Sequence, residues 1–263
     1  MYQTNYVRAS STDDAVAKLD DEAKLLAGGM TLLPTMKQRL ASPETLIDLA
    51  DCGLAGIEDL GDTLKIGAMT RHVDVETSEI VAKSIPALAV LAAKIGDRQV
   101  RNRGTIGGSI ANNDPSACYP SAALALDATI HTNSRDIAAD DFFVGMFETA
   151  LEEDEIITAI SFPKPAAAAY AKFPNPASRY AMVGVFVAKG DSVRVTVTGA
   201  GEDGVFRHAG LEAALTSSFA PESVEPVTVS GEEMISDMHA ASDYRAHLVK
   251  EMTRRAVAAC GWP

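Results

Sequence analysis

Metal-binding and disulfide patterns are absent from this 263-residue chain. Its three cysteines, Cys52, Cys118 and Cys260, are widely spaced and form no CxxC pair, which excludes a disulfide framework and a zinc or iron–sulfur motif. The five histidines show no HxxxH or HExxH spacing, and we interpret them as surface or capping residues. We therefore expect no metal site in this chain.

Positive charge and long apolar runs are also scarce. Lys and Arg number 23 against 36 Asp and Glu, which gives a formal net charge of −13. Nucleic acids and anionic membranes bind proteins through cations that neutralise phosphates, so neither is an expected partner. The most apolar stretch, near residues 85 to 95, is broken by Pro86 and Lys94, and the N-terminus lacks the apolar core of a signal peptide. We expect a folded cytoplasmic protein without membrane insertion.

Hydrophobic periodicity predicts a mixture of helices and strands. Residues 5–50 indicate strand, helix, strand, loop, helix and strand, with Ser11 and Thr12 at the first helix N-terminus. Further along the chain we expect a hairpin over 54–69, a helix over 86–96 that ends at Gly96, a helix over 120–127, a strand at ATIHT and a strand over 155–162.

Proline and alanine concentrate in residues 163–178, which we interpret as a boundary or a long irregular connection. Two strand-like runs follow, separated by Gly190 and Asp191 as in a hairpin. A helix with Tyr244, Leu248, Met252 and Ala256 periodicity closes the chain and is expected to place Arg245, Lys250, Arg254 and Arg255 on its wetter faces. The expected domains are residues 1–165, with subdomains of about 1–55 and 56–165, and residues 166–263.

Two glycine-pair segments carry most of the functional information: AGGMTLLP at 27–34 and TIGGSIANNDP at 105–115. Glycine can adopt a positive φ without a Cβ clash, and it lets a ligand lie directly against the main chain. Each pair leads into a Thr or a Ser, as in loops whose N–H groups surround an anion. Two such segments predict a diphosphate held from two sides.

A third glycine-rich segment, GAGEDG at 199–204, fits the GxGxxG pattern of dinucleotide-binding folds. Its Glu202 and Asp203 would repel a pyrophosphate. Only about sixty residues follow it, too few for both halves of such a fold. We interpret this segment as an acidic hairpin or connecting loop.

The residues and the order of the first two segments resemble those of the FAD-binding medium subunits of molybdenum hydroxylases, the group that includes aerobic carbon monoxide dehydrogenase and the FAD domain of xanthine dehydrogenase. Two later segments also resemble the carboxy-terminal domain of that group: NPASRYAMVGVFVAK at 175–189 and MHAASDYRAHLVKEMTRRAV at 238–257. The resemblance therefore covers nearly the whole chain. It implies an α+β fold: a two-subdomain FAD-binding domain of the PCMH-like type, followed by a smaller C-terminal α+β domain with a short antiparallel sheet and helices.

The resemblance implies that both segments bind the FAD diphosphate from opposite sides, through backbone N–H groups and hydroxyls. Thr31 replaces the Ser that is more usual in the group and keeps the hydroxyl. The implied diphosphate residues are Ala27, Gly28, Gly29, Met30 and Thr31 in the first segment, and Thr105, Ile106, Gly107, Gly108 and Ser109 in the second.

Residues after the second segment are implied to surround the flavin side. Asp114 matches the DP of the group, whereas Cys118 stands where many relatives have Asp, and it either lines the site or packs as a small hydrophobic residue. Asn113, like Asn112, either binds ribityl hydroxyls or shapes the turn. Arg101 and Arg103 flank the segment, and we interpret them as part of an exposed basic loop.

Three later residues complete the implied flavin site. Lys172 stands where related domains have a lysine that stabilises the anionic reduced flavin; the alternative is a solvated strand lysine. Tyr180 lies where relatives have an aromatic residue beside the ring, preceded here by Arg179 where they often have Asp. Ile157 occupies the position of a backbone contact to the ring edge.

The function implied by the resemblance is electron transfer, with no catalytic residue in this chain. A large subunit oxidises a substrate at a molybdenum cofactor, a small subunit carries [2Fe–2S] clusters, and FAD in this chain receives the electrons, within a dimer of heterotrimers. Two alternatives stay open, a free-standing flavin oxidase and a non-enzymatic scaffold without FAD. No His or Cys lies in a glycine segment for covalent flavin attachment, and a scaffold has no need of both glycine pairs.

Overall fold

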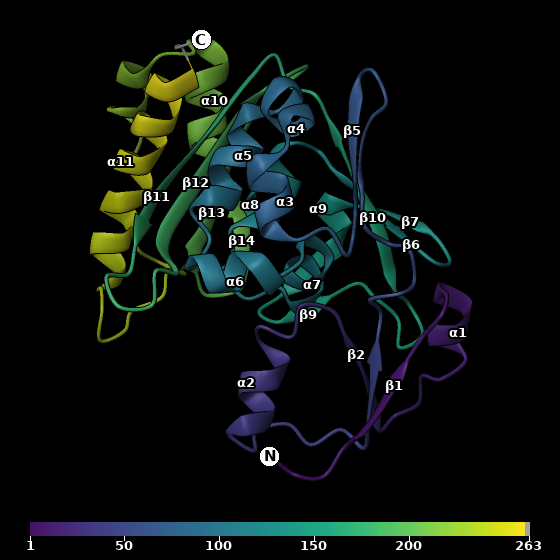
Figure 1. Ribbon diagram of the computed structural model, residues 1–263. Helices are drawn as coiled ribbons and strands as arrows, with labels where there is room; N and C mark the ends of the chain where they lie inside the picture. Colours follow the sequence, from purple (N-terminus) through teal and green to yellow (C-terminus); the bar gives the residue numbers. More distant parts are fainter. Residues whose placement is uncertain (261–263) are drawn as a thin grey trace.

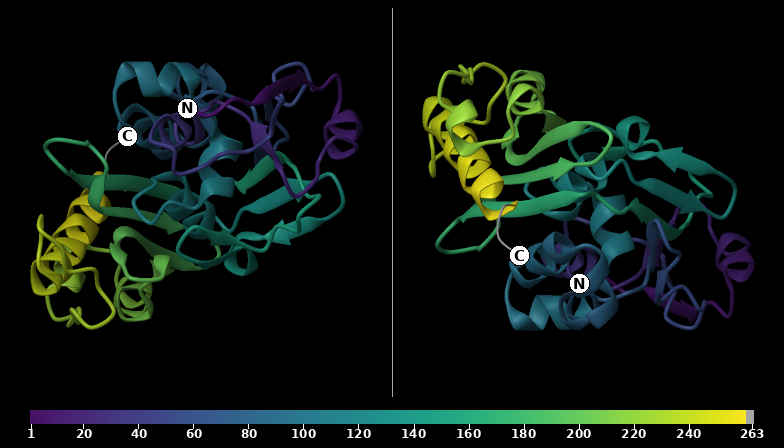
Figure 2. Two further views of the ribbon diagram at one scale, coloured as in Figure 1. Left: turned by 90° about the horizontal axis from the view of Figure 1, so that it is seen from below. Right: turned by 90° about the horizontal axis from the view of Figure 1, so that it is seen from above.

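The computed structural model describes residues 1–260, in which three sheets and a short hairpin are joined by helices (Figure 1). Figures 1 and 2 place the first strand and the last helix at opposite ends of the molecule, with residues 56–165 between them. Mixed helix and sheet content, with separate antiparallel sheets, confirms the predicted α+β fold class.

The N-terminal part is a small parallel sheet with strand order β1-β3-β2 and two short helices. Ser11 is the N-cap of the first helix, as the sequence predicts, and its hydroxyl oxygen accepts a hydrogen bond from the Asp14 N–H at 3.1 Å. The glycine segment lies between the second strand and the second helix. The elements are β1 (Asn5–Arg8), α1 (Thr12–Val16), β2 (Ala23–Leu26), α2 (Leu32–Lys37) and β3 (Thr45–Asp48).

The middle part is a five-stranded antiparallel sheet, order β4-β5-β10-β6-β7, covered by short helices. Its first two strands form the predicted hairpin. The strands are β4 (Ile57–Asp59), β5 (Thr63–Gly67), β6 (Thr129–Thr132), β7 (Asp136–Ala138) and β10 (Ile157–Pro163), and β8 (Phe143–Gly145) pairs with β9 (Glu148–Thr149). The helices are α3 (His72–Thr77), α4 (Glu79–Ser84), α5 (Pro86–Ala93), α6 (Arg98–Arg103), α7 (Ile106–Asn112), α8 (Tyr119–Ala125) and α9 (Ala139–Phe142).

The C-terminal part is an antiparallel sheet, order β11-β12-β13-β14, buried on both faces. Val183, Val185 and Val187 pack with α11, whereas Phe186 and Ala188 join the core of the middle part. These residues belong to β12, and burial on both of its faces explains why this strand is an almost unbroken apolar run. The elements are β11 (Ala167–Pro174), β12 (Ala181–Lys189), β13 (Val193–Gly201), β14 (Gly204–Arg207), α10 (Ala209–Ser217), the 3₁₀ helix η1 (Pro221–Val224) and α11 (Ser242–Cys260).

Within the described residues, the three hydrophobic cores correspond to residues 1–55, 56–165 and 166–260, apart from a few crossing side chains such as Ile156 and Tyr170. On this basis we propose the domain division expected from the sequence. The acidic GAGEDG segment is the predicted hairpin turn, because Glu202 and Asp203 lie between β13 and β14.

Of the two interpretations of residues 163–178, the long irregular connection is wrong, whereas the domain boundary that we propose falls within the stretch. The stretch contains β11, whose flanking prolines lie at its ends while Ala169 and Ala171 pack with α11. Arg245 does not lie on a wet face of α11: it is 3% exposed and donates to the Met182 and Gly199 carbonyls, each at 2.7 Å.

No helix within the described part of the chain is both long enough and apolar enough to cross a membrane.

Candidate functional site

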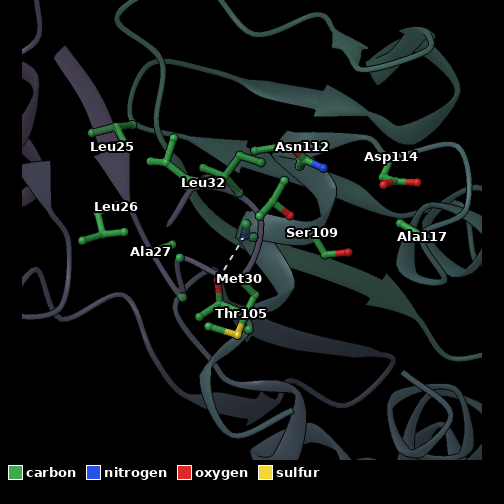
Figure 3. A pocket seen from close by; sticks show the side chains of 18 of the residues that line it. Leu25, Leu26, Ala27, Met30, Leu32, Thr105, Ser109, Asn112, Asp114 and Ala117 are labelled. Carbon is green, nitrogen blue, oxygen red and sulfur yellow. Dashed lines mark hydrogen bonds between the residues drawn. The ribbon is translucent and has the colours of Figure 1, made fainter. Parts of the chain in front are cut away.

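A cavity of about 1190 Å³ lies where the N-terminal, middle and C-terminal parts of the chain meet. It is larger than the roughly 300–1,000 Å³ typical of sites for drug-sized ligands, so it accommodates an extended ligand. Figure 3 shows residues of both glycine segments, Ala27 and Met30 from the first and Thr105 and Ser109 from the second, around this space.

The first glycine segment leaves its main-chain donors unused. Gly29 has a φ of 72°, which turns the chain from β2 into α2. Within residues 1–260, the N–H groups of Gly28, Gly29, Met30 and Thr31 donate to no carbonyl or side chain. All four residues line the cavity. Consecutive free N–H groups of this kind form an anion-binding concavity.

The second glycine segment is built differently, because it is the first turn of a helix rather than a loop. The Thr105 hydroxyl caps α7 and accepts the Gly108 N–H at 3.2 Å. The Ile106 and Gly107 N–H groups donate to the Thr70 and Ala68 carbonyls at 3.0 and 2.9 Å. These two donors are therefore already satisfied by the protein, and neither glycine of this pair has a positive φ.

The glycines of both segments pack closely against neighbouring parts of the chain. A Cβ on Gly28 would lie 2.2 Å from the Arg103 carbonyl oxygen, and one on Gly107 would lie 2.5 Å from the Ala68 Cβ. A Cβ on Gly108 would stand 2.9 Å from the Thr105 Oγ1, whereas its distance of 3.6 Å from the Ala27 Cβ is an ordinary contact. Close approach of neighbouring main chain, rather than a positive φ, is thus what requires Gly28 and Gly107.

The predicted flavin-side residues Asp114, Cys118, Lys172 and Tyr180 all line the same cavity. The Lys172 ammonium lies 2.8 Å from the Lys94 carbonyl oxygen and 3.5 Å from the Cys118 sulfur. Burial raises the pKa of the Asp114 carboxyl. Burial also raises the pKa of Tyr180, and the neighbouring Asp114 and Cys118 add to that shift.

Two of the predicted residues turn away from the cavity. Asn113 ends α7 with a φ of 40° and donates to the Gly145 and Glu148 carbonyls at 2.8 and 2.9 Å, so its side chain shapes the turn toward the β8–β9 hairpin. The Ile106 side chain is fully buried in the core of the middle part. The remaining members of the predicted set line the cavity: Ala27, Gly28, Gly29, Met30, Thr31, Thr105, Gly107, Gly108, Ser109 and Ile157.

Arg101 and Arg103 do not belong to a loop, as the sequence suggested, but to helix α6, in which Arg103 is exposed. Arg101 is engaged away from the cavity, because it pairs with Glu76 at 2.6 Å and donates to the Ile95 carbonyl at 3.1 Å.

Several cavity residues lack an individual prediction, among them Leu25, Ile95 and His72. The signal that could have found Leu25 is its place in β2, the strand that leads directly into the first glycine segment. Nothing in the sequence around His72 predicts its burial, and the expectation that the histidines are surface or capping residues is wrong for this one. It is 5% exposed, and burial, with the nearby Arg101 charge, lowers its pKa to about 4.

Comparison with known families bears directly on this site. The family model described as the FAD binding domain in molybdopterin dehydrogenase matches residues 2–165. The chain belongs to this family. That match spans the N-terminal and middle parts, and with them both glycine segments.

Relatives extend the similarity over the whole chain. The nicotine 6-hydroxylase medium subunit of Paenarthrobacter nicotinovorans is 37% identical, covering 97% of this chain and 96% of the relative. The carbon monoxide dehydrogenase medium chain of Hydrogenophaga pseudoflava is 36% identical, covering 96% and 95%. The chain is thus similar along its full length to subunits of oxidoreductases, and we describe it as an oxidoreductase subunit of this family.

Solved structures agree with this assignment. A carbon monoxide dehydrogenase structure from H. pseudoflava superposes with a TM-score of 0.91 at 36% identity, covering 98% of this chain and 97% of that chain. Quinoline 2-oxidoreductase from Pseudomonas putida 86 gives a TM-score of 0.88 at 28% identity, covering 98% and 97%. These matches confirm the predicted two-part architecture of a PCMH-like FAD-binding domain and a smaller C-terminal α+β domain.

Proposed function

We propose that the cavity binds FAD with its diphosphate where the two glycine segments meet. The observation that supports this most strongly is the row of free N–H groups from Gly28 to Thr31, which faces the cavity opposite Thr105 and Ser109. Main-chain donors supply local positive potential, so an anion can be held in a chain whose net charge is −13. Because Ile106 and Gly107 donate within the protein, the first segment would supply most of the main-chain contacts.

The isoalloxazine ring would lie at the end of the cavity formed by Asp114, Cys118, Ile157, Lys172 and Tyr180. Bound FAD supplies the electron-transfer chemistry. Lys172 places a cation at this end, where it would favour the anionic reduced form of the flavin. Tyr180 is 49% exposed, so its ring lies at the mouth of the cavity and would limit access to the flavin.

We further propose that the chain passes electrons from the [2Fe–2S] clusters of a small subunit to an external acceptor, while a large subunit holds the molybdenum cofactor. Relatives named as medium chains, medium subunits and a dehydrogenase complex subunit support such partners. We also propose that the three subunits assemble as a dimer of heterotrimers and that this complex is located in the cytoplasm.

Thr31→Val tests the diphosphate placement, since it keeps the shape of the side chain and removes the hydroxyl. Thr31 lies at the N-terminus of α2 but makes no capping bond there, so stability should not change. Loss of a hydrogen bond to a charged group, about 1.5–3 kcal/mol, should raise the FAD dissociation constant by about tenfold or more. Thr77→Val is the matched control, because Thr77 is an exposed helical threonine that does not line the cavity.

Flavin titration of the apoprotein measures both variants, and equal affinities for Thr31→Val and wild type would refute this placement. The subunit role is tested separately by identifying the chains that co-purify with this one. Reduction of the flavin by an organic substrate in the absence of any partner would replace the subunit function with that of an oxidase.

A further inference from the structure

A hydrogen-bonded row of serine, histidine and aspartate lies across the five-stranded sheet, outside the flavin cavity. The Ser161 hydroxyl oxygen lies 2.7 Å from His131 Nε2, and His131 Nδ1 lies 2.6 Å from a carboxylate oxygen of Asp136. Neighbouring strands supply the three residues, Ser161 from β10, His131 from β6 and Asp136 from β7 (Figure 1). None of the three lines the cavity, so the row has no part in the proposed flavin site.

The two partners of the imidazole fix the direction of both hydrogen bonds. An ionised carboxylate can only accept, so the Asp136 contact assigns the imidazole proton to Nδ1. Nε2 is then an acceptor, and the Ser161 hydroxyl donates to it. In this arrangement an imidazole can take the proton of a hydroxyl nucleophile, while the carboxylate holds the tautomer and the orientation of the ring.

The row lies on the face of the sheet that is turned away from the core. The residues that alternate with it along the strands, Ile130, Ile137 and Ile160, are buried in the core of the middle part. The side chains of His131 and Asp136 are 23% and 66% exposed, and Ser161 is half-buried. A small reagent can therefore reach the serine hydroxyl from solvent.

Lys65 adds a cation to the same face, because it is the direct partner of Ser161 in the antiparallel pairing of β10 with β5. Side chains of directly opposed residues in such a pair lie on one face of the sheet, about 4.5–5.5 Å apart at Cβ. A positive charge at this distance favours the negative charge that develops on a carbonyl oxygen when a hydroxyl attacks its carbon.

Ser134 provides a contrasting environment on the same protein. Its hydroxyl donates to the Glu155 carboxylate at 2.7 Å rather than to an imidazole. Hydrogen bonds from Arg135 hold the pKa of the Glu155 carboxyl at about 2, so this group is a poor acceptor for a serine proton near neutral pH. Ser134 is also more exposed than Ser161. A comparison of the two serines thus separates the effect of a neighbouring base from that of solvent access.

We propose that Ser161 is a nucleophile that takes acyl groups from small activated esters, with His131 as its general base and Asp136 as the residue that positions the imidazole. A bond forms between the Ser161 oxygen and the acyl carbon, and the bond from that carbon to the leaving aryloxide oxygen breaks. The serine proton passes to His131 Nε2 and then to the leaving oxygen, so an acyl-serine and a phenol result. Because the row lies outside the cavity, the reagents are small esters that react without an enclosing pocket.

The test uses the full chain with its flavin bound and p-nitrophenyl acetate as the acyl donor. Samples are quenched with acid at short times, before water removes the acyl group, and peptide mass spectrometry measures acetylation of Ser161 and Ser134 in one sample. We expect Ser161 to react about a hundredfold faster, which is the lower end of the contribution of a positioned general base. An equal or higher rate at Ser134, or acetyl groups on lysines alone, would overturn the proposal.

His131→Gln keeps a hydrogen-bonding side chain beside Ser161 but removes the base. It should lower the Ser161 rate by about a hundredfold and leave the Ser134 rate unchanged. Asp136→Asn should lower the Ser161 rate by only about tenfold, because the exposed carboxylate is screened by solvent and salt. An unchanged Ser161 rate in folded His131→Gln would contradict the role of the imidazole. Should that variant fail to fold, the ranking of the two serines in the wild-type chain decides the proposal by itself.

Discussion

The Lys172 ammonium is held by the backbone carbonyl of Lys94, 2.8 Å away. That carbonyl belongs to the residue that ends α5, so the contact joins the middle part of the chain to β11 of the C-terminal part. A second hydrogen bond joins the same two parts, because the Lys94 ammonium donates to the Tyr170 carbonyl of β11. Burial and the nearby Lys172 charge lower the pKa of Lys94. The position of the cation at the proposed flavin end is thus set by two structural parts together.

Lys172→Met should lower the reduction potential of the bound flavin, because it removes the cation that favours the anionic reduced form. A loss of about 1.4 kcal/mol corresponds to roughly 30 mV for a two-electron couple. Spectroelectrochemical titration of the flavoprotein measures the shift. Lys172→Arg keeps the charge and should keep most of the potential; an unchanged potential in Lys172→Met would remove Lys172 from the flavin site.

Gly28→Ala should weaken both the fold and FAD binding. The new Cβ would lie 2.2 Å from the Arg103 carbonyl oxygen, so the first glycine segment must move away from the Arg103–Gly104 main chain. Overpacking of this kind costs about 1–3 kcal/mol. Gly190→Ala is the control, because a Cβ there has no atom within 4 Å. Denaturant unfolding and flavin titration measure the two effects, and equal behaviour of both variants would show that the close approach is unimportant.

His72 should make the protein sensitive to mild acid. Its pKa is about 4 in the folded chain, whereas the ordinary pKa of a histidine is 6.5, so between these values the unfolded chain binds a proton that the folded chain does not. The stability contributed by the neutral ring is complete above about pH 6.5 and is lost as the pH falls to 4, a change of about 3 kcal/mol.

Urea unfolding at a series of pH values between 7 and 4 measures this dependence. His72→Gln, which cannot be protonated, should flatten the dependence in that window, whereas the same change at the exposed His239 should not. A His72→Gln profile as steep as that of wild type would assign the acid sensitivity to other groups.

Arg245→Met should destabilise the chain by about 3 kcal/mol, since it removes a buried cation from Asp237 and leaves two carbonyls without their donor. Gly199, one of the two, donates its own N–H to the Pro115 carbonyl at 2.7 Å, so the loop that carries Asp114 should also loosen. Arg254→Met, on a more exposed pair with Glu251, should cost less than about 1 kcal/mol. Thermal unfolding compares the two, and similar losses would contradict the buried role of Arg245.

The sequence by itself was sufficient for features that depend on neighbouring residues. The Ser11 cap, the hairpin turns at Gly61 and Gly190, and the acidic turn at Glu202 follow from local backbone preferences and charge. The glycine segments also indicated the family, because their residues and order are sufficiently specific. Each of these conclusions rests on a few adjacent positions.

Tertiary contacts decided what local pattern could not. Flanking prolines suggested an irregular segment, yet β11 forms because Ala169 and Ala171 fit closely against α11. Arg245 and His72 are buried because distant segments supply their surroundings. The two glycine pairs look alike in sequence, but only the first keeps free donors, since the Thr70 and Ala68 carbonyls reach the second. Hydrogen-bond partners far away in the chain therefore determine which N–H groups remain available to a ligand.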